Sequence, residues 1–227
     1  MTSPTELHTT SAAAAPDTAG DTSARARTRR RRRRWAVVAA VVAIGALAGT
    51  LGVRWLRPYL YHGAVLQAPD EAPSMEGLHY TDGTPVDLSA LRGDVVVVYF
   101  GYTHCPDICP TTLAAVSRAL DDLGGDADDV HVLVLTIDPE RDTDEVLEAY
   151  VGAFDEHIRG VSGDLASIER VASLYGVYFA KGEAMADGYA MDHTATLMGI
   201  DPDGHLRIVW PNEITAADLA SDLDELR

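Results

Sequence analysis

Two continuous runs of apolar, largely β-branched residues constrain the fold of this chain more than any other feature. They are DVVVVYF at 94–100 and VHVLVLTI at 130–137, and neither alternates polar with apolar positions. Strands that are buried on both faces of a sheet have this pattern. Between the two runs, apolar residues repeat at helical spacing: Leu113, Val116, Leu120 and Leu123. This order predicts a strand–helix–strand unit with two parallel, buried strands.

The later part of the chain predicts the rest of an α/β domain. A helix is expected to start behind Asp142 as its N-cap, and another to run from Asp164 to Gly176. The runs HTATLMGI and HLRIVW flank a turn at 201–204 and predict a β-hairpin, and a last helix follows a Thr215 cap. A parallel βαβ unit, a hairpin and a closing helix together predict a thioredoxin-like fold, a central mixed sheet flanked by helices.

The only two cysteines, Cys105 and Cys109, lie in the turn between the first buried strand and its helix. Pro110 is well placed as the first helical residue, so Cys109 is expected beside the helix N-terminus. The positive end of the helix dipole there favours the thiolate of Cys109. A disulfide would close a very short loop and add only ~2 kcal/mol, which argues against a purely structural role. Since a thiolate both attacks disulfides and binds Cu(I), a redox pair and a metal site remain open.

The N-terminal part of the chain has an arginine-rich tail followed by an apolar segment. Eight arginines lie between Arg25 and Arg34, and no charged residue lies between Trp35 and Val53. At ~1.5 Å per residue, a helix of these 19 residues is just long enough to cross a hydrocarbon core of ~30 Å. The positive-inside rule then keeps the N-terminus in the cytoplasm and places the rest of the chain outside.

Four regions follow from these observations. They are a disordered, arginine-rich cytoplasmic tail at 1–34, a transmembrane helix at 35–53, a linker at 54–73 and a thioredoxin-like domain at 74–227. The protein is thus expected in the cell membrane, single-pass, with an exocytoplasmic C-terminal domain. The alternative is a cleaved signal peptide with its apolar core at 35–48. A retained anchor is favoured because the apolar stretch continues beyond the potential cleavage site.

The charge of the exported part limits its partners. The chain has 18 Lys and Arg against 35 Asp and Glu, and the first 34 residues hold eight of the former and three of the latter. The remainder therefore carries 10 basic against 32 acidic residues. A domain with this excess of negative charge excludes a groove that binds nucleic acid. The charge also argues against the domain lying flat on an anionic bilayer.

Three motifs occur in order along the chain: YFGYTHCPDICPTTL at 99–113, TIDPERDT at 136–143 and MDHTATLMGIDPDG at 191–204. In order and spacing they closely resemble the Sco (SenC) family of membrane-anchored copper proteins, over roughly residues 75–227. The resemblance implies a thioredoxin-like fold and one copper ion, as Cu(I) or Cu(II), bound by the cysteine pair and a distant histidine. At the matching positions the ligands would be Cys105, Cys109 and His193.

The chemistry of these residues agrees with that implication. Two thiolates and one imidazole suit trigonal Cu(I), and can hold Cu(II) with a further weak ligand. His193 is expected to open the predicted hairpin strand, which in a thioredoxin-like arrangement runs past the cysteine loop. The run from Lys181 to Asp201 lacks the proline that thioredoxin-like oxidoreductases place there, which favours a metal site over a general disulfide exchanger. Zinc suits the same ligands, but the order of affinities favours copper.

Three neighbouring residues have weaker assignments. Asp107, between the cysteines, is either a weak ligand of oxidised copper or an ordinary capping aspartate. Asp138 follows the second buried strand and is a candidate support behind the ligands, within a turn that starts the next helix. His104 is adjacent to Cys105 and is expected to point away from it. A peroxidase is disfavoured because no Arg or Lys lies near the cysteines in sequence.

The family resemblance implies a copper chaperone, rather than an enzyme, that delivers copper to the binuclear copper A centre of cytochrome c oxidase. Its partners would be the copper-site subunit of the oxidase, a copper donor and an exocytoplasmic thiol reductant. The reductant is needed because a Cys105–Cys109 disulfide has no thiolate to offer Cu(I). The alternatives are a thiol–disulfide oxidoreductase that keeps the oxidase cysteines reduced, with Cys105–Cys109 as its redox-active disulfide, and a copper or redox sensor. Only copper binding requires His193.

Overall fold

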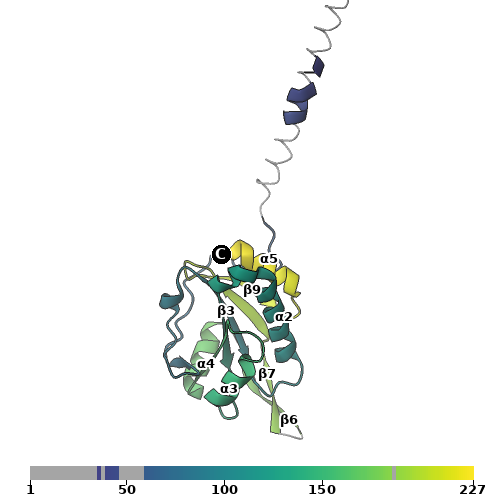
Figure 1. Ribbon diagram of the computed structural model, residues 1–227. Coiled ribbons are helices and arrows are strands. Elements are labelled where there is room, and N and C mark those ends of the chain that lie inside the picture. The colour runs from purple at the N-terminus through teal and green to yellow at the C-terminus, as the bar shows by residue number, and fades with distance from the viewer. Residues whose placement is uncertain (1–34, 37–38, 46–58, 186–187) are drawn as a thin grey trace, which may run out of the picture. The chain divides into compact units, whose positions relative to one another are not determined.

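The two apolar runs form the centre of a seven-stranded mixed sheet (Figure 1). In this computed structural model, which describes residues 35–36, 39–45, 59–185 and 188–227, β3 (Val95–Gly101) and β4 (Val130–Thr136) pair in parallel. Every residue of β3 is buried. The prediction of a parallel pair of buried strands is therefore confirmed.

The remaining elements complete the sheet and its helical cover. The strand order is β1-β9-β8-β3-β4-β5-β2. The other strands of this sheet are β1 (Ala64–Val65), β2 (Leu78–Tyr80), β5 (Ile158–Gly163), β8 (Thr196–Ile200) and β9 (Leu206–Pro211). The helices of the part from residue 59 onward are α2 (Ile108–Leu123), α3 (Asp144–Val151), α4 (Leu165–Leu174) and α5 (Ala216–Leu226), with short 3₁₀ turns η1 (Leu88–Leu91) and η2 (Gly124–Asp129).

The pairing directions make this a mixed sheet. Strand β5 is parallel to β4, whereas β8 is antiparallel to β3 and β9 to β8. Helix α2 packs against α5, and Figure 1 shows this pair away from α3 and α4, which contact β5. The predicted α/β architecture of a central sheet flanked by helices, and the predicted β8–β9 hairpin, are confirmed.

A second hairpin was missed by the sequence analysis. Strands β6 (Phe179–Met185) and β7 (Gly188–His193) form their own antiparallel two-stranded sheet, which extends past the main sheet at the bottom of Figure 1. The register shifts between Lys181 and Ala184, so apolar and polar positions do not alternate regularly along β6. His193 therefore ends β7, and does not open the β8–β9 hairpin as predicted.

Two predicted helix starts are also corrected. Helix α2 begins at Ile108, so Pro110 is its third residue. This position tolerates proline because the N–H groups of the first turn have no partner inside the helix. Helix α3 has Thr143 as its N-cap, with the side chain accepting a hydrogen bond from the Val146 amide, while Asp142 is buried and bonded elsewhere.

The folded unit runs from Tyr59 to Arg227 and so starts earlier than residue 74. Strand β1, within the predicted linker, pairs with β9. The predicted tail lies outside the described residues, as does much of the predicted membrane helix, of which residues 35–36 and 39–45 are described as helical. In the part of the chain that is described, no helix has both the length and the apolar character to span a membrane.

Candidate metal centre

The two cysteines lie where β3 passes into α2, at the carboxyl end of the sheet. Cys105 is in the loop and half-buried, and Cys109 is in the first turn of α2 with only 1% of its surface exposed. Both are free thiols. The Cys109 backbone amide donates to the Cys105 sulfur over 3.4 Å. The helix N-terminus thus points its donor at Cys105, as well as holding Cys109 in its first turn.

The environments of the two sulfurs push their pKa values in opposite directions. Hydrogen bonds from the Cys109 thiol, from His193 and from backbone amides lower the pKa of Cys105 well below its usual range. Interaction with Cys105 and burial raise the pKa of Cys109. The sequence analysis assigned the favoured thiolate to Cys109, which is wrong for the metal-free pair, because the half-buried sulfur receives the donors and the buried one loses solvation.

Two buried hydroxyls lie close to Cys109. Tyr99 Oη and Thr112 Oγ1 are buried and have no hydrogen-bond partner among the described residues. Gly101 allows the close packing here, since a Cβ at this position would lie 2.8 Å from the Tyr99 ring and 3.3 Å from the Cys109 sulfur. The Tyr99 hydroxyl is nevertheless close enough to the Cys109 sulfur and to Thr112 to affect the pKa values of Tyr99 and Cys109, so these groups touch without forming well-aligned hydrogen bonds.

His193 reaches the cysteines from the end of β7, 84 positions along the chain from Cys109. Its Nε2 lies 3.8 Å from Cys109 Sγ, and its Nδ1 lies 3.2 Å from the Thr194 carbonyl oxygen. With its proton on Nδ1, donated to that carbonyl, the ring would offer the Nε2 lone pair to a metal ion, whereas in the metal-free pair Nε2 faces the sulfurs as a hydrogen-bond donor to Cys105. The ring packs edge-on against Tyr102, with centroids 5.9 Å apart.

The donor set suits one soft metal ion. Two ligands bound to one metal at about 2.3 Å through sulfur and about 2.0 Å through nitrogen lie roughly 3.5–3.8 Å apart. The Cys109–His193 separation of 3.8 Å agrees with that range. Among the described residues, no group of three or more Cys, His, Asp or Glu side chains is already gathered as a metal site. The three predicted ligands thus lie near one another, and their side chains would have to move closer together to bind one ion.

The candidate support Asp138 contacts the His193 hairpin and not the cysteines. Its carboxylate is 2% exposed, accepts a hydrogen bond from the Tyr189 hydroxyl over 2.8 Å and pairs with Arg141. Arg141 and Tyr189 were missed by the sequence analysis. Only the DPERDT motif signalled that its residues matter, and nothing local pointed to their partners in the hairpin.

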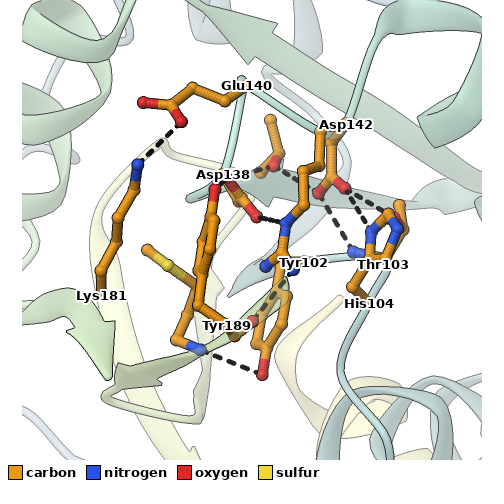
Figure 2. Close-up of polar contacts among 11 residues, drawn as sticks. Tyr102, Thr103, His104, Asp138, Glu140, Asp142, Lys181 and Tyr189 are labelled. Carbon is orange, nitrogen blue, oxygen red and sulfur yellow. Dashed lines mark hydrogen bonds and ion pairs between the residues drawn. The ribbon is translucent and has the colours of Figure 1, made fainter. Parts of the chain in front are cut away.

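Asp142, predicted as a helix cap, instead fixes the start of the cysteine loop. Its carboxylate accepts a hydrogen bond from the Thr103 amide over 3.0 Å (Figure 2). It also accepts one from the Thr136 hydroxyl over 2.6 Å. His104 turns towards this carboxylate, with Nδ1 3.6 Å from an Asp142 oxygen. It therefore points at Asp142, as Figure 2 shows.

Asp107 is exposed at the N-cap position of α2 and makes no capping hydrogen bond. Its side chain accepts a long contact of 3.5 Å from the Thr111 hydroxyl. The capping role considered for it is therefore not seen.

Comparison with known proteins gives the family to which the chain is similar. The SCO1/SenC family model matches residues 77–227. The chain is 37% identical over 115 residues to the human mitochondrial SCO1 homolog, covering 49% of this chain and 38% of that protein. It is 31% identical over 146 residues to a putative copper-binding protein of Stutzerimonas stutzeri, covering 63% and 71% respectively. The matched region thus spans well under half of the human relative.

The chain is also similar to solved structures. The chain resembles ScoI of Bradyrhizobium japonicum with copper bound, at 37% identity and a TM-score of 0.61, over 70% of this chain and 98% of that one. It also resembles copper-bound ScoI of Arabidopsis thaliana, at 30% identity and a TM-score of 0.61, over 70% and 95%. Both similarities cover most of the folded unit.

Proposed function

The chain belongs to the SCO1/SenC family, and from this premise we propose that its folded unit binds one copper ion as cargo through Cys105, Cys109 and His193. We further propose that it delivers this ion to the binuclear copper A centre of cytochrome c oxidase, from an exocytoplasmic position on a single membrane anchor. The observation that supports the site most directly is the approach of His193 Nε2 to within 3.8 Å of Cys109 Sγ, from a segment 84 residues away.

The three proposed ligands differ in burial, and this difference sets the role of each in binding and releasing copper. Cys109 is buried in the first turn of α2, whereas Cys105 and His193 are half-exposed. Two thiolates and an imidazole supply the soft, low-coordinate donor set that Cu(I) prefers. An incoming ligand from the oxidase subunit reaches the Cys105 and His193 side first, so these two are the ligands that exchange and Cys109 is the one that leaves last.

A second function is favoured by the opposite pKa shifts of the two thiols. With its lowered pKa, Cys105 is a thiolate at neutral pH and able to attack a disulfide in a target protein, releasing one target thiolate. Cys109 would then give its proton to a released target thiolate and attack the Cys105 sulfur of the mixed disulfide, freeing the second target thiolate and leaving a Cys105–Cys109 disulfide. An exocytoplasmic dithiol reductant must restore the pair. This reaction would keep the oxidase cysteines reduced, and it does not require His193, which would assist it only through its hydrogen bond to Cys105.

Anaerobic titration of the reduced, detergent-solubilised protein with Cu(I) against a competing chelator tests the copper proposal. One ion per chain is expected, with affinity at least ~10-fold lower in His193→Ala. His205→Ala is the matched control, because His205 is a partly exposed histidine beside Asp201 at the β8–β9 turn and should leave the affinity unchanged. Binding that is indifferent to His193 would contradict the three-ligand site and favour the redox function.

A further inference from the structure

One short turn behind the proposed ligands, residues 136–142, contacts both segments that carry them. We propose that Arg141 in this turn is a positioning residue: it holds the β6–β7 hairpin, and with it His193, against the cysteine loop. This inference rests on the proposed copper site and deepens it, since it concerns how His193 is brought to the metal.

Arg141 contacts the hairpin through Nη1 and the face of its guanidinium group, while its buried Nη2 has no hydrogen-bond partner among the described residues. Its Nη1 donates to the Tyr189 carbonyl oxygen over 2.9 Å, and its Cζ lies 3.8 Å from the centroid of the Tyr189 ring. Its Nε donates to the Asp138 carboxylate. The side chain is only 17% exposed, so these interactions are shielded from water and stronger than those of a surface arginine.

The same hairpin residue is bound a second time by the turn. The Tyr189 hydroxyl donates to Asp138, labelled in Figure 2, over 2.8 Å. Asp138 also accepts a hydrogen bond from Arg141. The three side chains thus form a closed triangle of contacts between the turn and β7. Tyr189 precedes His193 by four residues on the same strand, so fixing one end of β7 limits the positions open to the other.

Arg141 also faces the strand end that leads into the cysteine loop. Its Cζ lies 5.9 Å from the centroid of the Tyr102 ring. The Tyr102 hydroxyl accepts a hydrogen bond from the Met191 amide over 3.3 Å, and its ring packs against His193. Arg141 therefore lies between a residue three positions before Cys105 and the strand that ends in His193.

The cysteine side of the turn is held by Asp142. This carboxylate, 1% exposed, accepts from the Thr103 amide over 3.0 Å and from the Thr136 hydroxyl over 2.6 Å. The adjacent residues Arg141 and Asp142 therefore hold the histidine segment and the cysteine segment respectively. By holding both segments, the turn sets the distance between Cys109 and His193.

A neighbouring contact provides a matched control. Lys181 of β6 pairs with Glu140 over 2.7 Å, next to Arg141 in sequence, and also joins the hairpin to the turn (Figure 2). Both side chains are more than half exposed, at 51% and 59%. A pair so exposed to water contributes little, so its loss should leave the hairpin in place.

A double-mutant cycle on the full-length protein separates positioning from general stability. Arg141→Met is expected to weaken Cu(I) binding about 10-fold when His193 is present and less than about 2-fold in the His193→Ala background. Arg141→Lys should recover part of the affinity, because it keeps the charge without the planar fork. Glu140→Gln should change the affinity less than about 2-fold in both backgrounds.

The outcomes separate the two proposals. Equal weakening by Arg141→Met with and without His193 would overturn the positioning role, as would no weakening at all. If His193→Ala alone left the affinity unchanged, the copper site itself would be overturned.

Hydrogen exchange of the metal-free protein gives a second test that does not involve copper. Arg141→Met is expected to speed exchange of the Met191 amide about 10-fold, while the amides of β3 and β4 keep their protection. Tyr189→Phe removes only the hydroxyl bond to Asp138 and should give a smaller increase at the same amide. Unchanged exchange throughout β7 in both variants would overturn the proposal.

Discussion

Two buried polar clusters of this domain differ in how many of their hydrogen-bonding groups have a partner within the chain. Asp222, with no exposed surface, is the centre of the first. Its carboxylate accepts hydrogen bonds from Trp210 Nε1 at 2.7 Å, the Tyr59 hydroxyl at 2.9 Å, His62 Nδ1 at 2.8 Å and the amides of His62 and Gly63 at 2.9 and 3.1 Å. Every one of these donors belongs to the chain, so the cluster fastens the segment before β1 to α5 and has no need of a ligand.

The second cluster, at the cysteines, is left incomplete. Cys109 is as buried as Asp222, yet its neighbours include the Tyr99 and Thr112 hydroxyls without partners and a histidine nitrogen at 3.8 Å. Native proteins rarely leave buried polar groups unpaired without a reason. The first cluster thus serves stability, while the second is the one to which we assign the copper or redox role proposed above.

Removing the centre of the satisfied cluster should have the largest effect on stability. Asp222→Ala leaves the Trp210 indole N–H and several other donors without their acceptor, and is expected to lower the free energy of unfolding by about 3 kcal/mol. Urea unfolding of the metal-free protein measures this. Cu(I) affinity should change less than about 2-fold, since the cluster is not part of the proposed site.

Asp218→Ala is the control for this prediction. Asp218 also faces His62, at 3.2 Å, but both side chains are 42% exposed; with the hydrogen bond that it accepts from Thr215 at the start of α5, its loss should stay below about 1 kcal/mol. A parallel loss of stability and copper affinity in Asp222→Ala would break the distinction between the two clusters.

In the incomplete cluster, the two cysteines should react with an alkylating reagent at different rates. In the reduced, metal-free protein, iodoacetamide is expected to alkylate Cys105 at least ~10-fold faster than Cys109, because thiolate is the nucleophile and Cys109 is buried. Since the pKa of Cys105 is lowered, its rate should stay nearly constant as the pH falls from 8 to 6, where an ordinary thiol slows about tenfold per pH unit. Peptide mass spectrometry measures both rates.

Unfolding the protein in guanidinium should make the two cysteines equal, which serves as the control. A Cys105 rate that falls steadily below pH 8.5, or faster alkylation of Cys109, would show that the order of thiol pKa values derived from the structure is wrong.

The smallest expected effect is that the contribution of the Asp222 cluster to the free energy of unfolding depends on pH. The bond to Asp222 raises the pKa of His62, so its contribution to stability is complete below the unfolded value of about 6.5 and is lost as the pH rises through the folded value. The pKa of Asp222 is lowered by its hydrogen bonds, although burial opposes this, and its contribution is lost only in acid, below about pH 4.

The cluster should therefore stabilise most between about pH 4 and 6.5. Urea unfolding at pH 5.5 and 8.5 should show His62→Gln less stable than the natural protein at the lower pH, with a smaller difference at the higher pH. A difference that does not change with pH would mean that His62 contributes only as a neutral hydrogen-bond donor.

The fold was predictable where the signal is local. The uninterrupted apolar runs of β3 and β4 and the helical spacing of α2 depend on residues close in sequence, and all three elements are found. The β6–β7 hairpin was not predictable by the same reasoning, since its register shift and its glycines blur any alternation. Its position depends on contacts with Asp138 and Arg141, about 50 residues away, which leave no periodic pattern in the sequence.

By itself, the sequence determined the buried strand–helix–strand unit, the position of both cysteines at the start of α2, and, through three motifs, which distant histidine to expect near them. Only the tertiary structure decided that His193 ends β7, that Asp142 holds the cysteine loop while Asp138 and Arg141 hold the hairpin, and that Cys105 has the lower pKa. The physical reason is the range of the interactions. Periodicity and helix ends depend on neighbouring residues, whereas burial, desolvation and hydrogen bonds between segments exist only once the chain has folded.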